Sequence, residues 1–403
     1  MRHHSSEQNL GGKSLHRISA AATVSVISAM KISAAGYYLP NQDPFATARG
    51  NAFVATADNP SAVFYNPAGL TQLETVQAQI GVYSIVLGNR ANVGGQRFEG
   101  ETEVQAAPHI YYTRPVNDKL VLGFGLNSPF GLGTDWGRNT SFSPVVTETR
   151  LAYISATAAA GYKLSNTLSI GASASMNYAD LTIEQGLGFP GSFLRFEGQD
   201  IGFTGSLGVL WQPHEQHSFG LNFTSGSTLN LEGETFSSTL PADSSAEFDF
   251  MTPARIAAGY SYRPAPGWNF AAGIEWLDWD SLDSLMLRSS SVGGQLPVAF
   301  NWESSFIYEV GASYITPDGW VYAMGYDYNS SAQPDKNFSP GVSDADRHWF
   351  NVGFGRRSES SSWMLAYQFG YSNRDVQGSS KMMVDGKYKS RHNSLSLSWQ
   401  QSF

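Results

Sequence analysis

The stretch ADNPSAVFYNPAGL, residues 57–70, separates two parts of the sequence that differ in pattern. It contains two prolines and two asparagines, and its apolar residues follow neither the period of a strand nor that of a helix. We therefore expect a compact, irregular or short-helical segment over residues 35–75. From residue 76 to residue 403 the chain is a succession of alternating apolar and polar runs, as strands are. This order predicts a small plug followed by a very large sheet.

Residues 1–34 have the layout of a secretory signal peptide. Three basic residues precede an apolar segment over residues 18–30, and small residues follow as far as Ala34, after which we place the cleavage site. A soluble amphipathic helix is the alternative, but the segment has no polar face beyond its serines and threonine. It is too short to cross a bilayer, and no apolar run of about 18 residues follows it, which excludes helical membrane spans.

The charge of the remaining chain excludes a nucleic-acid binder. Residues 35–403 contain 21 basic and 33 acidic groups, a net charge of −12, and such a chain repels a phosphate backbone. The sequence has no cysteine, so it offers neither a disulfide framework nor a thiolate site. Charged residues make up 15% of the chain, below the roughly 25% of globular proteins. This composition fits transmembrane strands, a soluble β-sandwich array or a secreted β-helix.

Residues 168–178 give the clearest strand, because apolar side chains alternate with small polar ones over a length that a tilted strand needs to cross a bilayer. Counting every such run predicts 14 strands. They lie at residues 76–88, 104–113, 120–127, 148–162, 168–180, 201–211, 217–229, 251–262, 268–277, 304–314, 320–328, 348–356, 362–373 and 393–403.

The connections between these runs decide between the three possibilities. They are alternately short and long, and this alternation is the signature of periplasmic turns and extracellular loops in outer-membrane barrels. Aromatic residues flank the short turns, as they do where lipid head groups meet water. We therefore predict an all-β chain: a 14-stranded antiparallel transmembrane β-barrel over residues 76–403, with an N-terminal hatch (plug) in its lumen.

Several motifs resemble the FadL outer-membrane family. The sequence AGY at residues 35–37 together with residues 58–70 closely resembles the hatch signature of that family, and NSPFG (127–131), TPAR (252–255) and DADRHW (344–349) look like further landmarks. The resemblance implies a barrel in the outer membrane of a Gram-negative bacterium that takes up hydrophobic molecules. It also implies a hatch that plugs the barrel, a pocket above it and a lateral exit through the wall.

The resemblance assigns roles to residues of the hatch. The hatch signature contains residues that hold turns rather than contact ligand: Asn59, Asn66, Pro67 and Ala68. The first mature residues reach the pocket and move when it fills, which makes Gly36, Tyr37, Tyr38 and Leu39 candidates for a gate. Arg255 is a candidate partner for a carboxylate, although pairing with the lumen acids Glu275, Glu309 and Asp327 is the alternative.

Two further regions have expected roles in transport. The predicted loops at residues 181–200 and 230–250 carry an unusual number of large apolar residues, which we interpret as an extracellular capture groove or as a lid. Its residues are Leu187, Phe189, Phe193, Leu194, Phe196, Phe236, Leu240 and Phe248. Proline cannot donate a hydrogen bond to the ladder, and a closed barrel has no edge strand where this would be harmless. We therefore place a lateral opening, or an ordinary bulge, at Pro108, Asn127, Pro129 and Gly131.

The expected ligand is a long-chain fatty acid, with uptake of aromatic hydrocarbons as the alternative. A polar porin is disfavoured by the plug, and an outer-membrane lipase by the absence of a Gly-x-Ser-x-Gly motif. No metal site or cofactor is expected, since the histidines lack metal-ligand spacing. The expected partners are outer-membrane lipid, lipopolysaccharide and the barrel-insertion machinery, which we expect to read the C-terminal Phe403; no nucleic acid is expected.

Overall fold

The structure is a computed structural model that describes residues 36–403, apart from residues 190, 240–243, 291–292 and 343. The expected signal peptide and Leu240 of the expected capture groove therefore lie outside the described residues. None of the helices in the described part of the chain has the length and apolar character needed to cross a membrane.

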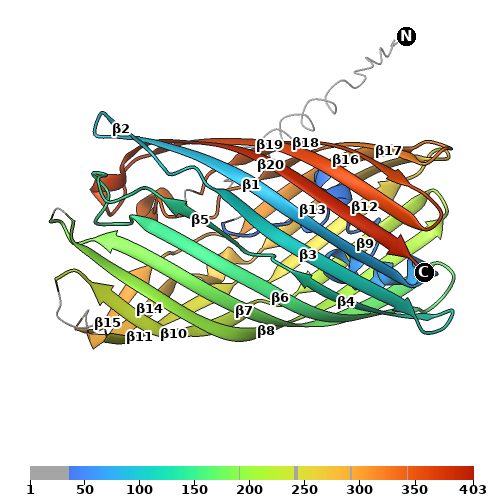
Figure 1. The fold of residues 1–403 in the computed structure, drawn as a ribbon, viewed down its shortest axis with the longest axis horizontal. Helices are drawn as coiled ribbons and strands as arrows, with labels where there is room; N and C mark the ends of the chain where they lie inside the picture. Colours follow the sequence, from blue (N-terminus) through green and yellow to red (C-terminus); the bar gives the residue numbers. More distant parts are fainter. Residues whose placement is uncertain (1–35, 190, 240–243, 291–292, 343) are drawn as a thin grey trace, which may run out of the picture. The chain divides into compact units, whose positions relative to one another are not determined.

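One antiparallel sheet closes on itself as a barrel (Figure 1). It closes between the first and last strands, which pair from Gln77 opposite Ser402 to Val93 opposite Gly386. Several strands are interrupted, so that two segments in line form one strand, and the total is the predicted 14. The strands are β1 (Gln77–Val93), β3 (Val104–Pro115), β4 (Leu120–Asn127) with β5 (Gly131–Asp135), β6 (Glu148–Lys163), β7 (Leu168–Gly186), β8 (Phe193–His214), β9 (His217–Thr224) with β10 (Ser227–Ser237), β11 (Ser244–Thr252) with β12 (Arg255–Tyr262), β13 (Trp268–Leu277) with β14 (Ser284–Ser289), β15 (Gly294–Ala299) with β16 (Ser305–Ile315), β17 (Trp320–Asn329), β18 (Arg347–Arg357), β19 (Ser361–Val376) and β20 (Gly386–Ser402).

Strands are longer than predicted at the end that carries the long connections. The regions expected as loops at residues 181–200 and 230–250 are mainly strand, because β7, β8, β10 and β11 continue past the predicted ends. The short strand β2 (Gln96–Glu99) likewise folds back on β1. The alternation persists there, with Leu181, Phe196 and Leu231 buried on the inner side. The prediction of loops was therefore wrong for most of these two ranges, although residues 187–192 do form a connection, in which Phe189 is exposed.

Two runs predicted as single strands are each divided in two. β9 and β10 are separated at residues 225–226, and β11 and β12 are separated at Pro253 and Ala254. Proline donates no hydrogen bond to a ladder, which accounts for the second interruption. The short connections and the C-terminus lie at one end of the barrel, on the right in Figure 1.

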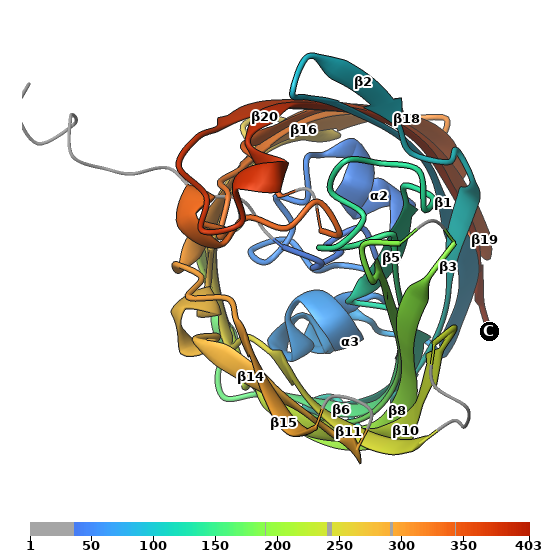
Figure 2. The ribbon, with the colours of Figure 1, turned by 90° about the vertical axis from the view of Figure 1, so that its left-hand side faces the viewer.

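Short helices of the inner segment, which we define as residues 36–73, lie inside the ring of strands (Figure 2). They are α2 (Pro44–Ala48), α3 (Ala62–Tyr65) and the 3-10 helix η2 (Pro67–Gln72). The Asp43 side chain caps α2 by accepting from the Ala46 amide at 2.8 Å. Asn66 caps η2 in the same way through the Ala68 amide at 3.1 Å, with Pro67 at the first helical position.

Glycines on the inner wall let the backbone of the inner segment approach the strands closely. A Cβ atom on Gly171 of β7 would lie 2.3 Å from the Ala68 nitrogen, and one on Gly325 of β17 would lie 2.2 Å from the carbonyl carbon of Arg49. No side chain fits at either position. The Asn66 amide donates to the Val54 carbonyl within the segment and to the Val209 carbonyl, and the second bond joins the segment to β8. The inner segment is therefore packed against the wall on several sides.

Candidate functional site

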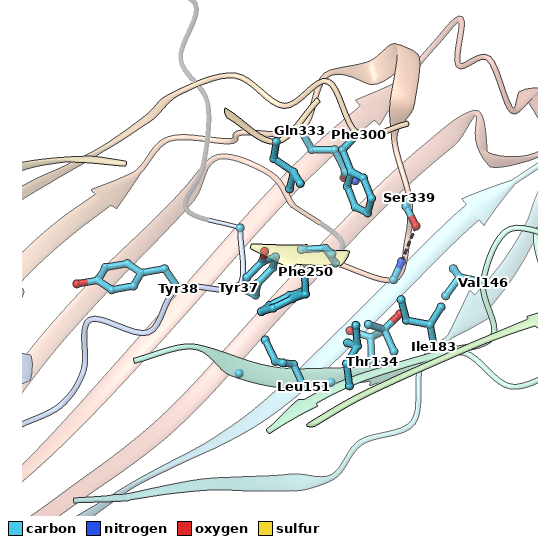
Figure 3. A pocket seen from close by; sticks show the side chains of 18 of the residues that line it. Tyr37, Tyr38, Thr134, Val146, Leu151, Ile183, Phe250, Phe300, Gln333 and Ser339 are labelled. Atoms are coloured by element: carbon cyan, nitrogen blue, oxygen red, sulfur yellow. Dashed lines mark hydrogen bonds between the residues drawn. The ribbon is translucent and has the colours of Figure 1, made fainter. Parts of the chain in front are cut away.

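A cavity of about 250 Å³ lies above the inner segment, towards the end of the barrel with the long connections. Its wall consists mainly of apolar side chains from strands far apart in the sequence (Figure 3). They include Ile85, Leu87, Leu151, Leu181, Ile183, Leu194, Phe196, Phe248, Phe250, Leu285, Leu287, Val298, Phe300 and Trp349. A concave site of this composition suits a hydrophobic ligand.

The first described residues, Gly36 to Leu39, form one side of this cavity. The Tyr37 ring stacks on Phe250 at 5.3 Å between centroids and meets Trp279 edge to face at 4.7 Å. Gly36 has a φ of +59° and leaves no room for a side chain, since its Cβ would lie 2.8 Å from atoms of both Trp279 and Trp302. Only glycine satisfies both conditions. An aromatic enclosure thus holds this end of the inner segment.

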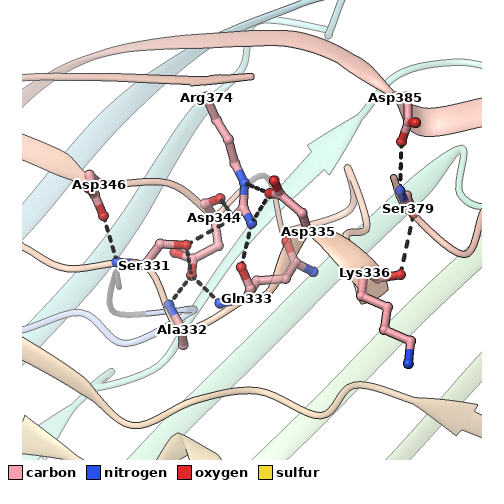
Figure 4. A network of polar contacts seen from close by, with 10 residues as sticks. All are labelled: Ser331, Ala332, Gln333, Asp335, Lys336, Asp344, Asp346, Arg374, Ser379 and Asp385. Carbon is pink, nitrogen blue, oxygen red and sulfur yellow. Dashed lines mark hydrogen bonds and ion pairs between the residues drawn. The ribbon is translucent and has the colours of Figure 1, made fainter. Parts of the chain in front are cut away.

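A polar network ties the connections at the mouth of the cavity together (Figure 4). The Asp344 carboxylate accepts from the Ala332 amide at 2.7 Å and from the Gly36 amide at 3.3 Å. Arg374 pairs with Asp335 at 2.7 Å and donates to the carbonyl of Asp344 at 2.6 Å. The connection between β17 and β18 is therefore bonded both to β19 and to the inner segment.

Two cations line the cavity itself, Lys381 and Arg347. Lys381 makes no ion pair with any described residue, and burial lowers the pKa of its ammonium group. The Arg347 guanidinium lies 4.0 Å from Asp344, and its buried Nε has no hydrogen-bond partner. Both cations can therefore still donate hydrogen bonds to an anion. The sequence prediction had not selected Lys381, which lies in a connection without any motif.

Arg255 occupies a different place, on the other side of Tyr38 from the apolar cavity. Its guanidinium pairs with Glu275 at 3.1 Å and donates to the Tyr38 hydroxyl at 2.8 Å and to Asn222 at 3.2 Å. The side chains of Arg255 and Glu275 are 5% and 3% exposed, so this ion pair is buried. The structure thus shows the alternative in which Arg255 pairs with a lumen acid, and it leaves the guanidinium little capacity for a ligand carboxylate.

A second, smaller cavity of about 60 Å³ lies beyond Tyr38. Tyr38 lines both cavities, and the second is bordered by Arg255 and by Asn127, Pro129 and Phe130 from the interruption between β4 and β5. Tyr38 and Phe130 form a β-bridge, with their ring centroids 5.5 Å apart. One residue of the inner segment therefore separates the apolar cavity from a space that reaches the interrupted strand.

The wall beside this interruption lacks part of its ladder. The pairing between β3 and β4 runs only from Ile110 to Pro115, so the other half of β3, which contains Pro108, has no such partner. The Gln105 amide bridges the gap by donating to the Gly133 carbonyl at 2.9 Å and accepting from its amide at 2.7 Å. We call this pair of bonds the Gln105 clasp.

The inner segment makes an equivalent contact on the other side of the interruption. The Gln42 amide donates to the Ser128 carbonyl at 2.8 Å and accepts from the Ser128 amide at 3.0 Å. The Leu39 amide donates to the Pro129 carbonyl, and the Gly131 amide to the Tyr37 carbonyl. The interruption is thus held from within by Gln42 and by Tyr37 and Leu39, the last two of which also line the cavity.

The residues expected in a capture groove divide into two groups. Leu194, Phe196 and Phe248 line the cavity from its wall. Leu187, Phe189, Phe193 and Phe236 do not line it; Phe189 is 72% exposed, and the Phe193 ring lies 4.0 Å from the Arg138 guanidinium. Sequence reasoning missed Trp349, Phe300 and Leu287. Trp349 belongs to a predicted strand, whereas Leu287 and Phe300 lie where the sequence analysis expected a loop.

A closed antiparallel barrel with an inner segment beneath an apolar cavity defines the class of outer-membrane transport barrels. The chain belongs to the family described as outer membrane protein transport protein (OMPP1/FadL/TodX), which matches residues 25–372. It is accordingly an outer-membrane protein of the Gram-negative type, and its family is one of transporters and channels rather than enzymes.

Relatives and solved structures agree with this assignment. The chain is 21% identical over 380 residues to the long-chain fatty acid transport protein of Salmonella typhi, which covers 83% of this chain and 87% of that protein. The long-chain fatty acid transport protein of Escherichia coli K12 is 20% identical over 390 residues, with the same coverage.

Two crystal structures show the same fold at low identity. A FadL homologue of Pseudomonas aeruginosa superposes with a TM-score of 0.82 at 18% identity, covering 92% of this chain and 100% of that one. The toluene transporter TodX of Pseudomonas putida superposes with a TM-score of 0.74 at 17% identity, covering 93% and 100%.

Proposed function

We propose that this protein takes up long-chain fatty acids passively across the outer membrane, by capture at the outer end, gating by the inner segment as a hatch, and lateral exit through the wall. The observation that carries the proposal is the position of Tyr38. It lies between an apolar cavity on one side and a space bordered by an interrupted strand on the other. Movement of this one residue connects the two.

The cavity supports a ligand with a long apolar part and one anionic group. Its wall is made of aliphatic and aromatic side chains, while Lys381 and Arg347 lie among them with unused capacity for an anion. A carboxylate bound there gains charge-assisted hydrogen bonds, and it relieves the cost of a buried ammonium group. We therefore assign the carboxylate to Lys381 and Arg347 rather than to Arg255.

Gating follows from the contacts of the first described residues. Tyr37 occupies an aromatic enclosure, and Tyr38 is held by Arg255 and Phe130. A ligand that binds better when these rings are displaced shifts the population towards the open arrangement. Because residues 37–42 also bond to the interruption at residues 128–131, the same displacement loosens the wall.

Uptake of aromatic hydrocarbons is the second candidate. The enclosure of Tyr37 by Phe250, Trp279 and Trp302 favours it, since displacing the tyrosine exposes three rings to which an aromatic ligand can bind edge to face. The two candidates differ in their need for a cation. A hydrocarbon has no group for Lys381 or Arg347 to bind.

Binding of a radiolabelled long-chain fatty acid to the detergent-purified protein tests the choice, with toluene and a short sugar as competitors. We expect saturable binding that the sugar does not displace and that Lys381→Gln weakens about tenfold, as loss of one charge-assisted hydrogen bond does. The matched control is Lys336→Gln, an exposed lysine of the neighbouring connection that does not line the cavity. Toluene binding that both variants leave unchanged, without fatty-acid binding, indicates the hydrocarbon channel instead; binding of neither ligand contradicts transport.

A further inference from the structure

Three cations alternate along the outer face of β20 near its beginning. Lys387, Lys389 and Arg391 are exposed, while the residues between them, Tyr388 and Ser390, are buried on the inner face. None of the three cations forms an ion pair with any residue in the described part of the chain. Successive outward positions of one strand thus carry unpaired positive charge.

The neighbouring strand adds to this charge. β19, β20 and β1 lie side by side in the wall (Figure 1), and Arg90 of β1 is directly opposite Lys389. Like charges at directly opposite positions of a sheet destabilise it. Arg90 lies 3.2 Å from Glu99, but it shares that carboxylate with Arg97. Lys389 has no such partner among the described residues.

Acidic groups on this part of the wall do not balance the cations. The outward-facing cations Arg90, Arg97, Lys387, Lys389 and Arg391 are accompanied by Glu99, by the exposed Glu101 and Glu103 that follow β2, and by Asp375, which is opposite Lys387 without an ion pair to it. The local excess of positive charge contrasts with a chain in which acidic residues outnumber basic ones. A mobile anion is the group that would satisfy it.

The height of these cations in the membrane follows from the strand itself. Towards the C-terminus the outward residues of β20 are Leu395, Leu397 and Trp399, which are 49% to 55% exposed. At about 3.3 Å per residue and a tilt of about 40°, Lys389 lies roughly 25 Å above Trp399 along the membrane normal. That distance matches the apolar band of about 25 Å in outer-membrane barrels. Lys389 therefore lies at the outer edge of the hydrocarbon and Lys387 just above it.

We propose that Arg90, Lys387, Lys389 and Arg391 form a binding site on the outer wall for the lipid A phosphates of lipopolysaccharide. The acyl chains of such a lipid run down the apolar outer faces of β20 and β1, beside Leu395 and Leu397, and its phosphates meet the cations at the level where the apolar band ends. Guanidinium groups bind phosphate in a bidentate manner and ammonium groups as point charges.

Native mass spectrometry of the full-length barrel in detergent tests the proposal, with lipid A bisphosphate as the probe. The variant carries Lys387→Gln, Lys389→Gln and Arg391→Gln together. We expect its affinity for lipid A to fall roughly tenfold to a hundredfold, since each cation near an anionic lipid surface contributes about a factor of five. Lipid A without phosphates is expected to bind the unmodified barrel as weakly as the bisphosphate binds the variant.

A matched control removes three exposed or half-buried cations at the short-turn end, by Arg114→Gln, Lys119→Gln and Lys163→Gln. Its lipid A affinity should equal that of the unmodified protein, and heat-modifiable migration in gels verifies that each barrel is folded. Equal losses in the two variants, or unchanged affinity in the first, overturn the site. Inorganic pyrophosphate that competes fully at micromolar concentration overturns it too, because the site is then one for a free anion.

Discussion

Arg255 of β12 and Glu275 of β13 form a buried ion pair on the inner side of the wall, and the pair explains why a lumen arginine need not bind ligand. Both side chains are almost completely buried, and Arg255 also donates to Tyr38 and to the carbonyl of Phe64 in the inner segment. A buried charge without its partner is costly, whereas the loss of both partners often is not. This arginine therefore stabilises the hatch.

Arg255→Met should destabilise the barrel by about 3–5 kcal/mol, because Glu275 is left buried without its cation. Arg255→Met combined with Glu275→Leu should recover most of that loss. Thermal unfolding in detergent measures both variants. A double variant as unstable as the single one would show that the pair is not the source of the effect.

The interruption between β4 and β5 is held at the scale of elements by two glutamines on its two sides. Gln42 belongs to the inner segment and Gln105 to β3, and each makes two bonds to one backbone residue of the interrupted strand. A side-chain amide offers the same donor and acceptor as a peptide group, so it substitutes for a missing rung of the ladder.

Gln105→Glu should open the wall, because a carboxylate cannot donate to the Gly133 carbonyl. We expect faster hydrogen exchange in β5 and faster uptake of fatty acid into cells, with ligand affinity unchanged. The control is Gln96→Glu, which makes the same change at an exposed position of β2. Exchange in β5 that is equal in both variants would show that the Gln105 clasp does not hold the wall.

At the scale of the whole molecule, the barrel and the hatch differ in what they need from each other. Except along the half of β3 beside the interruption, the strands pair with their neighbours, and the sheet closes between β1 and β20, so most of the ladder requires no contribution from the inner segment. The helices of the inner segment are short, and isolated helices of that length are unstable in water. The hatch therefore depends on the barrel for its structure.

Deletion of residues 37–73 should leave a folded, heat-modifiable barrel that admits small sugars. Swelling of liposomes in arabinose measures this, and the unmodified protein should remain closed because the inner segment lies inside the ring of strands and packs against its wall (Figure 2). A folded deletion variant that stays closed to arabinose would show that the side chains of the wall block the lumen without the hatch.

The strand count, the closed barrel and the place of the inner segment in the sequence were predicted from alternation, turn spacing and one irregular stretch. These are local features, because the period of apolar residues is set by the strand itself. The ends of the strands were not predictable. β7 and β8 are longer than a strand that only crosses the bilayer, and in the sequence their extensions resemble extracellular loops because polar residues are frequent in both. The same limit concealed the inward position of Phe196 and Phe248.

The sequence by itself determined the architecture of this protein and the membrane that holds it, because the period of apolar residues and the spacing of turns are local properties of the chain. Only the tertiary structure decided which charges meet which partners. It placed Arg255 beside Glu275 and Gln105 beside Gly133, and it left Lys381 and Arg347 in the cavity wall able to bind an anion. Such pairings depend on the register of neighbouring strands and on the position of the inner segment, which the local pattern along the chain does not specify.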